Sequence, residues 1–206
     1  MSKKKIAIQG ELGAYSHIAA ENLYKDPEIK TCTTFEETFK EAYNDPSCKI
    51  VIPIENSLAG RVADIHYLLP KYKLQIHGEH FQAVEHNLLC KPDATISDIK
   101  FVRSHAQAIG QCQNLITKKK FKPIISADTA GSAKDLAEGN DKSIAAIASE
   151  LSAKIYNLKI LEKNIEDEKG NVTRFLIMGK NIEQPEFAKN KKFITSCIFR
   201  VKSEPS

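Results

Sequence analysis

The feature that most constrains the fold is an apolar segment that ends in three polar residues. The segment Ile50–Ile54 is almost entirely apolar and mostly β-branched, as expected for a buried strand of a mostly parallel sheet. Glu55, Asn56 and Ser57 follow it directly, and apolar residues at helical spacing begin at Val62. We therefore expect Asn56 or Ser57 to cap a helix, at the sheet edge where ligands bind in open α/β folds. For this segment alone, plain helix capping with a solvated Glu55 is the better explanation.

Strand and helix patterns alternate along most of the chain, which favours an α/β fold. A capping box at Thr34 and Glu37 predicts that a helix follows Thr34. Pro70 is expected to end the helix that begins after Val62. The apolar patterns predict strands at residues 6–8, 72–76, 81–89, 101–103, 122–126, 143–148, 175–178 and 193–201.

Hydroxyl and amide side chains recur where the predicted strands end. Ser16 follows a turn that contains two glycines, Ser104 is a plausible N-cap, and Gln111 shares a helical face with Gln107. Each has a plain structural explanation as a cap, a turn or a solvated side chain. Taken together, neutral donors beside helix N-termini favour a small anion. The further members of this set are Thr129, Asn171 and Thr173, and the charged Arg174 follows them.

Composition excludes several classes of function. None of the apolar runs among the 206 residues approaches the roughly 20 residues that span a membrane. Lys3–Lys5 lead directly into the first strand without an apolar signal segment, so we expect a cytoplasmic protein. The net charge of +4 comes without interleaved aromatic residues, so no nucleic-acid partner is expected.

The cysteines and histidines do not predict a metal site. The five cysteines are scattered and form no CxxC pair, which is typical of reduced, buried thiols. His77, His80 and His86 lie close together in sequence, but no carboxylate or thiol completes a ligand spacing. We therefore expect neither a metal nor an organic cofactor.

Seven segments, in this order along roughly residues 5–180, resemble the prephenate dehydratase domain of phenylalanine biosynthesis. Asp128 and Ser132 are a departure, because the family favours Ser and Ala there. The matching segments are Gly10–Ser16, Pro53–Val62, His86–Leu89, Ser104–Cys112, Thr129–Ala130, Ala145–Ser149 and Asn171–Phe175.

The resemblance implies a two-lobed α/β fold like that of type-2 periplasmic binding proteins, with the active site between the lobes. The catalytic domain would span residues 1–180, with lobe 1 at about 1–76 plus 174–180 and lobe 2 at about 77–173. Residues 181–192 would be a linker. Residues 193–206 resemble the first strand of an ACT domain whose remainder is missing or cut off, which puts feedback inhibition by phenylalanine in doubt. A homodimer is usual in the family.

The resemblance also implies a reaction, the conversion of prephenate to phenylpyruvate, carbon dioxide and water. Thr173 would be essential for catalysis, Asn56 would be a further catalytic residue, and Glu55 would be a second candidate acid if it is buried. Arg174 would clamp a carboxylate or pack beside Phe175. The substrate would be oriented by Ser16, Ser57, Ser104, Gln111, Thr129 and Asn171.

Two other functions stay open at this point. A dehydratase acting on arogenate would use the same chemistry on a substrate with an amino group in place of the side-chain keto oxygen. A solute-binding or sensing module could have the same two-lobed fold without catalysis. Comparing turnover of both substrates separates these possibilities.

Overall fold

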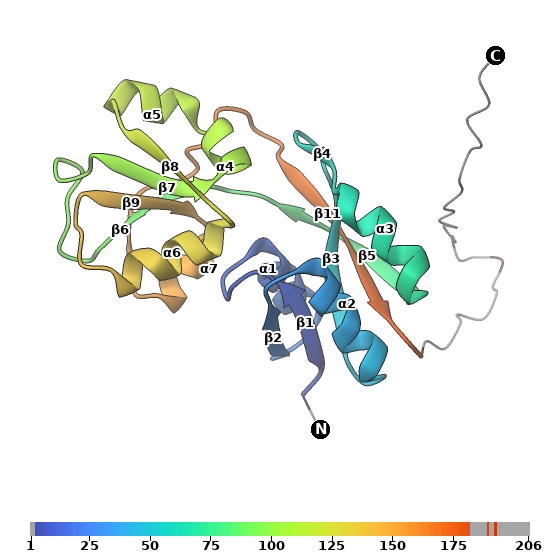
Figure 1. Cartoon of the computed structure of the whole chain (residues 1–206). Helices are drawn as coiled ribbons and strands as arrows, with labels where there is room; N and C mark the ends of the chain where they lie inside the picture. Colours follow the sequence, from blue (N-terminus) through green and yellow to red (C-terminus); the bar gives the residue numbers. More distant parts are fainter. Residues whose placement is uncertain (1–2, 182–188, 190–191, 193–206) are drawn as a thin grey trace, which may run out of the picture.

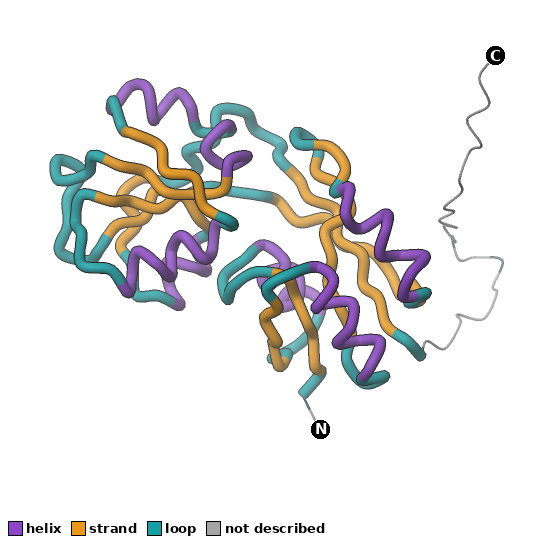
Figure 2. The backbone as a smooth tube through the Cα atoms, viewed as in Figure 1, coloured by secondary structure: helices purple, strands orange, loops and turns teal. Residues whose placement is uncertain are grey.

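The expected alternation of strands and helices is confirmed, and it builds two sheets, one in each of two lobes (Figures 1 and 2). The computed structural model describes residues 3–181, 189 and 192. The expected linker at 181–192 lies almost wholly outside the described residues, and the expected ACT-like strand at 193–206 lies entirely outside them.

The first lobe contains a mixed sheet with the strand order β2-β1-β3-β11-β5, and the short strand β4 pairs with β3. Helices α2 and α3 cover one face and α1 covers the other. The elements are β1 (Lys5–Gln9), α1 (Tyr15–Leu23), β2 (Glu28–Cys32), α2 (Phe35–Asn44), β3 (Lys49–Asn56), β4 (Gly60–Arg61), α3 (Ala63–Tyr72), β5 (Gln75–Ala83) and β11 (Val172–Gly179).

Burial on both faces explains the unbroken apolar run of β3. Ile50 and Ile52 pack with Phe39 of α2, whereas Val51 packs with Ala19 of α1 on the opposite face. Successive side chains of a strand point to opposite faces, so a strand covered on both sides needs apolar residues throughout. β3 therefore lies in the middle of the lobe, and its polar end at Asn56 projects from a rigid support.

The second lobe contains a sheet with the order β10-β6-β9-β7-β8. One hydrophobic cluster packs α4 and α5 against this sheet, and another packs α6 and α7 against it. The elements are β6 (Asn87–Cys90), β7 (Phe101–His105), α4 (Ala106–Gly110), α5 (Gln113–Lys119), β8 (Lys122–Ser126), α6 (Thr129–Glu138), β9 (Ile144–Ala148), α7 (Glu150–Ile155) and β10 (Lys159–Glu162).

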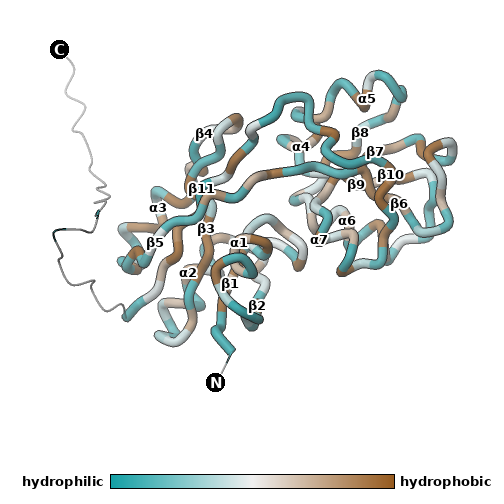
Figure 3. The backbone as a smooth tube through the Cα atoms, turned by 180° about the vertical axis from the view of Figure 1, so that it is seen from behind, coloured by the Kyte–Doolittle hydropathy of each residue, from teal (hydrophilic) through white to brown (hydrophobic). Residues whose placement is uncertain are grey.

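The expected lobe boundaries at residues 76 and 173 need correction. β5 pairs with β11 from Gln75 to Ala83, so all of β5 belongs to the first lobe, and β11 begins at Val172. The strand expected at 72–76 is right only at Gln75 and Ile76, because α3 continues through Pro70 to Tyr72. The strand expected at 81–89 is interrupted, since its two ends belong to β5 and β6. The segment 75–83 is largely hydrophilic (Figure 3), so no apolar alternation marks the full length of β5 in the sequence.

The turn before α1 connects the two lobes by hydrogen bonds. The carbonyl of Gly13 accepts hydrogen bonds from Ser149 Oγ at 2.6 Å and Ser152 Oγ at 3.1 Å. Nearby, Lys134 Nζ lies 3.1 Å from Glu11 Oε1. Gly13 has φ +91°, and a Cβ there would lie 2.7 Å from Ser152 Cα. Only glycine fits both the backbone angle and the close approach.

We therefore expect Gly13→Ala to lower the free energy of unfolding by at least about 2 kcal/mol, from backbone strain and overpacking. Urea unfolding measures this. Gly78→Ala is the matched control, because nothing lies within 4 Å of a Cβ at that position. Equal stability of the two variants would show that the lobes tolerate a larger residue at this contact.

Candidate active site

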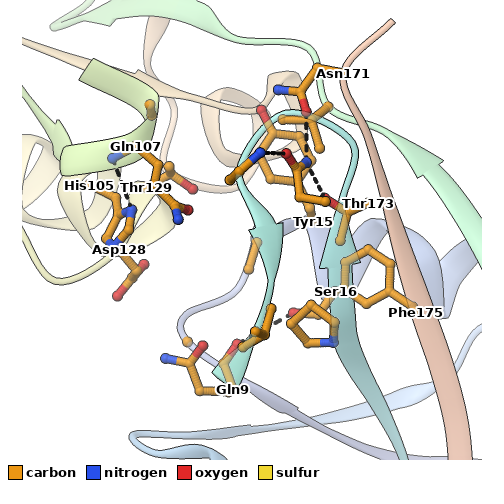
Figure 4. A pocket seen from close by; sticks show the side chains of 18 of the residues that line it. Gln9, Tyr15, Ser16, His105, Gln107, Asp128, Thr129, Asn171, Thr173 and Phe175 are labelled. Carbon is orange, nitrogen blue, oxygen red and sulfur yellow. Dashed lines mark hydrogen bonds between the residues drawn. The ribbon is translucent and has the colours of Figure 1, made fainter. Parts of the chain in front are cut away.

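A cavity of about 500 Å³ lies between the lobes, and residues of both lobes line it (Figure 4). The first lobe contributes Asn56, Asn171 and Thr173 from the ends of β3 and β11, together with the start of α1. The second lobe contributes the starts of α4 and α6. The other polar residues that line the cavity, from both lobes, are Gln9, Tyr15, Ser16, Arg61, Asp64, His86, His105, Gln107, Gln111, Asp128 and Thr129.

Asn56 fixes the direction of a hydrogen-bonded network in this cavity. Its Oδ1 accepts from the backbone N–H groups of Leu58 and Ala59, at 3.0 and 2.8 Å. Backbone N–H groups can only donate, so the Asn56 amide has one possible orientation. Its Nδ2 therefore donates to Asn171 Oδ1 at 2.7 Å and to Thr173 Oγ1 at 2.9 Å.

The order of donors and acceptors that Asn56 sets continues from the first lobe to the second. Because Asn171 Oδ1 is an acceptor, its Nδ2 donates, and it reaches Gln111 Oε1 at 3.0 Å. Gln111 Oε1 also lies 2.9 Å from His86 Nε2, so we assign the proton of His86 to Nε2. Tyr15 Oη then lies 3.0 Å from His86 Nδ1. A continuous chain of hydrogen bonds thus joins Tyr15 to Thr173.

His86 holds its place in this chain as a neutral imidazole. Burial lowers the pKa of His86, and the opposing effects of Gln111 and Glu166 are smaller. Burial also raises the pKa of Tyr15 well above its usual value, so the phenol keeps its proton. That proton is shared between His86 Nδ1 and the carbonyl of Glu85, which lies 2.7 Å from Tyr15 Oη.

The loop before β11 hydrogen-bonds to the backbone of two members of the hydrogen-bonded network, His86 and Gln111. The N–H of His86 donates to Glu166 Oε2 at 2.9 Å, and the carbonyl of His86 accepts from Ile165 N at the same distance. The N–H of Asp167 donates to the carbonyl of Gln111 at 2.7 Å, and its carboxylate accepts from the first two N–H groups of α5. The part of this loop from Ile165 to Asp167 holds His86 and Gln111 in position and does not itself line the cavity.

Thr173 presents a hydroxyl hydrogen to the cavity. Its side chain is 8% exposed, and its oxygen accepts from Asn56. No acceptor among the residues that the structure describes takes the Thr173 hydroxyl hydrogen. The hydroxyl is therefore held at a fixed point while its hydrogen stays available to a bound molecule.

Glu55 and Arg174 lie away from the cavity, contrary to expectation. The side chain of Glu55 is 53% exposed, so the burial required of a candidate acid is not met. Arg174 Nε donates to Glu79 Oε2 at 2.7 Å and its Nη1 donates to Glu55 at 3.2 Å. Both residues directly precede or follow a cavity residue on a strand, and neighbouring side chains of a strand point to opposite faces. The carboxylate-clamp interpretation of Arg174 is therefore not supported.

Ser57 and Ser104 also differ from expectation. Ser57 Oγ donates to the carbonyl of Gly170 at 3.1 Å and accepts from Val172 N at 2.9 Å, so it ties the turn after β3 to β11. Ser104 is fully buried in β7 and donates to the carbonyl of Ile147 at 2.7 Å. Neither residue lines the cavity.

The expected helix caps are corrected in the same way. The helix α3 has Val62 at its N-cap, without a side-chain hydrogen bond, because the β4 hairpin separates it from Asn56 and Ser57. The N-cap of α4 is His105 rather than Ser104, and its Nδ1 accepts from Gln107 N.

Ser16 and Thr129 lie in the cavity as expected. Ser16 is in the first turn of α1 and Thr129 is the first residue of α6, whose N-cap is Asp128. The sequence did not identify Tyr15, His86 or Asp128 as site residues. The described part of the chain contains no His, Cys, Asp and Glu cluster suited to a metal ion. It also contains no helix long and apolar enough to cross a membrane.

Comparison with known proteins agrees with this geometry. The family model described as "Prephenate dehydratase" matches residues 6–183. An arogenate dehydratase/prephenate dehydratase of Arabidopsis thaliana is 40% identical over 204 residues, which cover 99% of this chain and 53% of that protein. A bifunctional N-acyl-homoserine lactone acylase/prephenate dehydratase of Komagataeibacter europaeus is 38% identical, over 97% of this chain and 71% of that protein.

The fold comparison gives the same answer. The crystal structure of the prephenate dehydratase from Staphylococcus aureus is 28% identical with a TM-score of 0.74, and the match covers 87% of this chain and 67% of that one. The expected two-lobed fold, like that of type-2 periplasmic binding proteins, is thereby confirmed. The chain spans about half the length of the plant relatives that it matches. Within the matched region, the chain belongs to the prephenate dehydratase family.

Proposed function

We propose that this chain catalyses the decarboxylative dehydration of prephenate to phenylpyruvate, carbon dioxide and water. The observation that carries the proposal is the Thr173 hydroxyl, which Asn56 holds at 2.9 Å in a cavity between two lobes. Membership of the family supports the same reaction. The proposed site residues are Ser16, Asn56, Gln111, Thr129, Asn171 and Thr173.

The reaction needs little more than positioning, because its product ring is aromatic. The bond from the ring to its carboxylate breaks, carbon dioxide leaves, and the electron pair moves into the ring. The bond to the ring hydroxyl breaks at the opposite carbon, and that oxygen needs one proton to leave as water. Thr173 would donate its hydrogen to this oxygen or relay a proton to it. Donors aimed at a developing charge typically give the largest catalytic effect.

The neutral network suits this chemistry. Asn56, Asn171 and Gln111 hold the site by amide hydrogen bonds, and none of these residues carries a charge. A cation paired with the ring carboxylate would stabilise the group that must be expelled. The N-terminal ends of α1 and α6 line the cavity and could hold the other carboxylate through free N–H groups.

Arogenate is the second candidate substrate, because several relatives carry that name. Incubating the full chain with prephenate or arogenate and measuring phenylpyruvate or phenylalanine tests both. An N-acyl-homoserine lactone belongs in the same experiment because one relative is named for acylase activity. Formation of phenylpyruvate supports the proposal. Binding of prephenate without product would instead indicate a solute-binding module.

Glu55→Gln is expected to leave the pH–rate profile of phenylpyruvate formation unchanged, because Glu55 is exposed and paired with Arg174. Steady-state rates across the pH range check this. A profile that loses one limb would return Glu55 to the list of candidate acids.

A further inference from the structure

Asp128 adds a negative charge to a cavity proposed to bind an anion. Its carboxylate is half-buried at the N-cap of α6, and its Oδ1 accepts from Gly131 N at 2.6 Å. Across the lobe boundary, its carboxyl carbon and Oδ1 lie 3.9 Å from where a Cβ of Gly10 would be. The carboxylate therefore lies where the two lobes approach each other.

Helix capping alone does not account for the charge. A serine accepts the same backbone hydrogen bond without a charge, and Ser and Asp are similar in strength as N-caps. No lysine, arginine or histidine within the described ranges pairs with Asp128. Arg61 and Asp64, the other cavity residues with a full charge, lie on the exposed segment from β4 to α3. Asp128 is thus a half-buried cavity carboxylate that no cationic side chain of the described residues neutralises.

The position of Asp128 relative to Thr173 determines which part of a substrate it meets. Figure 4 shows Asp128, Thr129, His105 and Gln107 on one side of the cavity and Asn171 and Thr173 on the other. In prephenate and arogenate, the ring hydroxyl and the three-carbon side chain are attached to opposite ring carbons. With the hydroxyl at Thr173, the side chain extends toward Asp128 and the start of α6.

The two substrates differ only in that side chain. Prephenate carries a keto group beside the carboxylate, whereas arogenate carries an ammonium group. An unpaired carboxylate repels the first side chain and attracts the ammonium of the second, and such a charge acts mainly on specificity. The N–H groups at the start of α6 are next to Asp128 and can donate to the side-chain carboxylate in both cases.

We propose that Asp128 is a specificity-determining residue that favours a substrate bearing an α-ammonium group, such as arogenate, over its keto analogue. This inference rests on the proposed function, because it assumes that the ring hydroxyl lies at Thr173. It adds a determinant of substrate choice that the catalytic network itself does not contain.

The test compares wild type, Asp128→Ser and Asp128→Asn on arogenate and prephenate. For Asp128→Ser, the ratio of kcat/KM for arogenate to that for prephenate is expected to fall at least about tenfold, because an opposite charge is lost. The kcat/KM for prephenate should stay level or rise. Asp135→Asn is the matched control, since Asp135 lies on the same helix and pairs with Arg103 at 3.3 Å outside the cavity.

Calorimetric binding of both compounds to the same proteins separates the two proposals. If wild type binds the compounds but converts neither, the proposed function fails, and the ratio of dissociation constants still decides the role of Asp128. An unchanged ratio in Asp128→Ser, or an equal loss for both substrates, overturns the inference and leaves Asp128 as a helix cap. If wild type binds neither compound, both proposals are wrong.

Discussion

Replacing Thr173 by alanine is expected to lower kcat for phenylpyruvate formation by about 10²–10³-fold, the typical loss when one donor to a developing charge is removed. The Thr173 hydroxyl accepts from Asn56 at 2.9 Å, and Thr173 lines the cavity. The binding surface is otherwise retained, so KM should change much less than kcat. Steady-state assays on the purified variant measure both constants.

Thr173→Ser is the matched variant, because it restores the hydroxyl without the methyl group. We expect it to recover most of the lost kcat, within about tenfold of wild type. Urea unfolding of the three proteins controls for stability. A normally folded Thr173→Ala protein with nearly wild-type turnover would remove Thr173 from the mechanism.

Replacing Asn56 by aspartate is expected to lower kcat by about 10²-fold, because the new side chain keeps its size and loses its donors. A carboxylate can still accept from the backbone of Leu58 and Ala59, so the turn after β3 is preserved. It cannot donate to Asn171 Oδ1 or Thr173 Oγ1, and it places a negative charge beside both oxygens. The same assay with prephenate checks the expectation.

Asn22→Asp serves as the control for this change. Asn22 lies on α1 and donates to Gln82 Oε1 at 2.9 Å, outside the cavity. We expect this variant to keep wild-type activity. If the two variants behave alike, the orientation of the Asn56 amide has no part in catalysis.

Much of the fold could be predicted because buried strands and capped helices have strong local patterns. The buried strand expected at 143–148 is confirmed as β9, and so is the capping box at Thr34 and Glu37. The strands β2 and β5 lie at the edges of their sheet and are mostly exposed, so their sequences lack an apolar pattern. The position of β5 in the sheet is fixed by its hydrogen-bonded pairing with β11, which lies far along the chain.

The candidate site was predicted in part, for equally physical reasons. Asn56 and Thr173, two residues that the resemblance implied, lie opposite each other in the pairing of β3 with β11. The alternation of side chains along a strand implies that Glu55 and Arg174 point away from that face, and the sequence contains this signal. His86 lies 71 residues from Tyr15, and no local pattern indicates such a contact.

The measurement that tests the central claim most directly is a double-mutant cycle of Asn56→Asp and Thr173→Ala on kcat for phenylpyruvate formation. If Asn56 acts mainly by holding the Thr173 hydroxyl, Asn56→Asp will slow the Thr173→Ala protein by much less than the about 10²-fold that it slows wild type, because the interaction with the hydroxyl is already lost. If the two losses multiply, Asn56 and Thr173 act independently, and the network between the lobes does not work through Thr173.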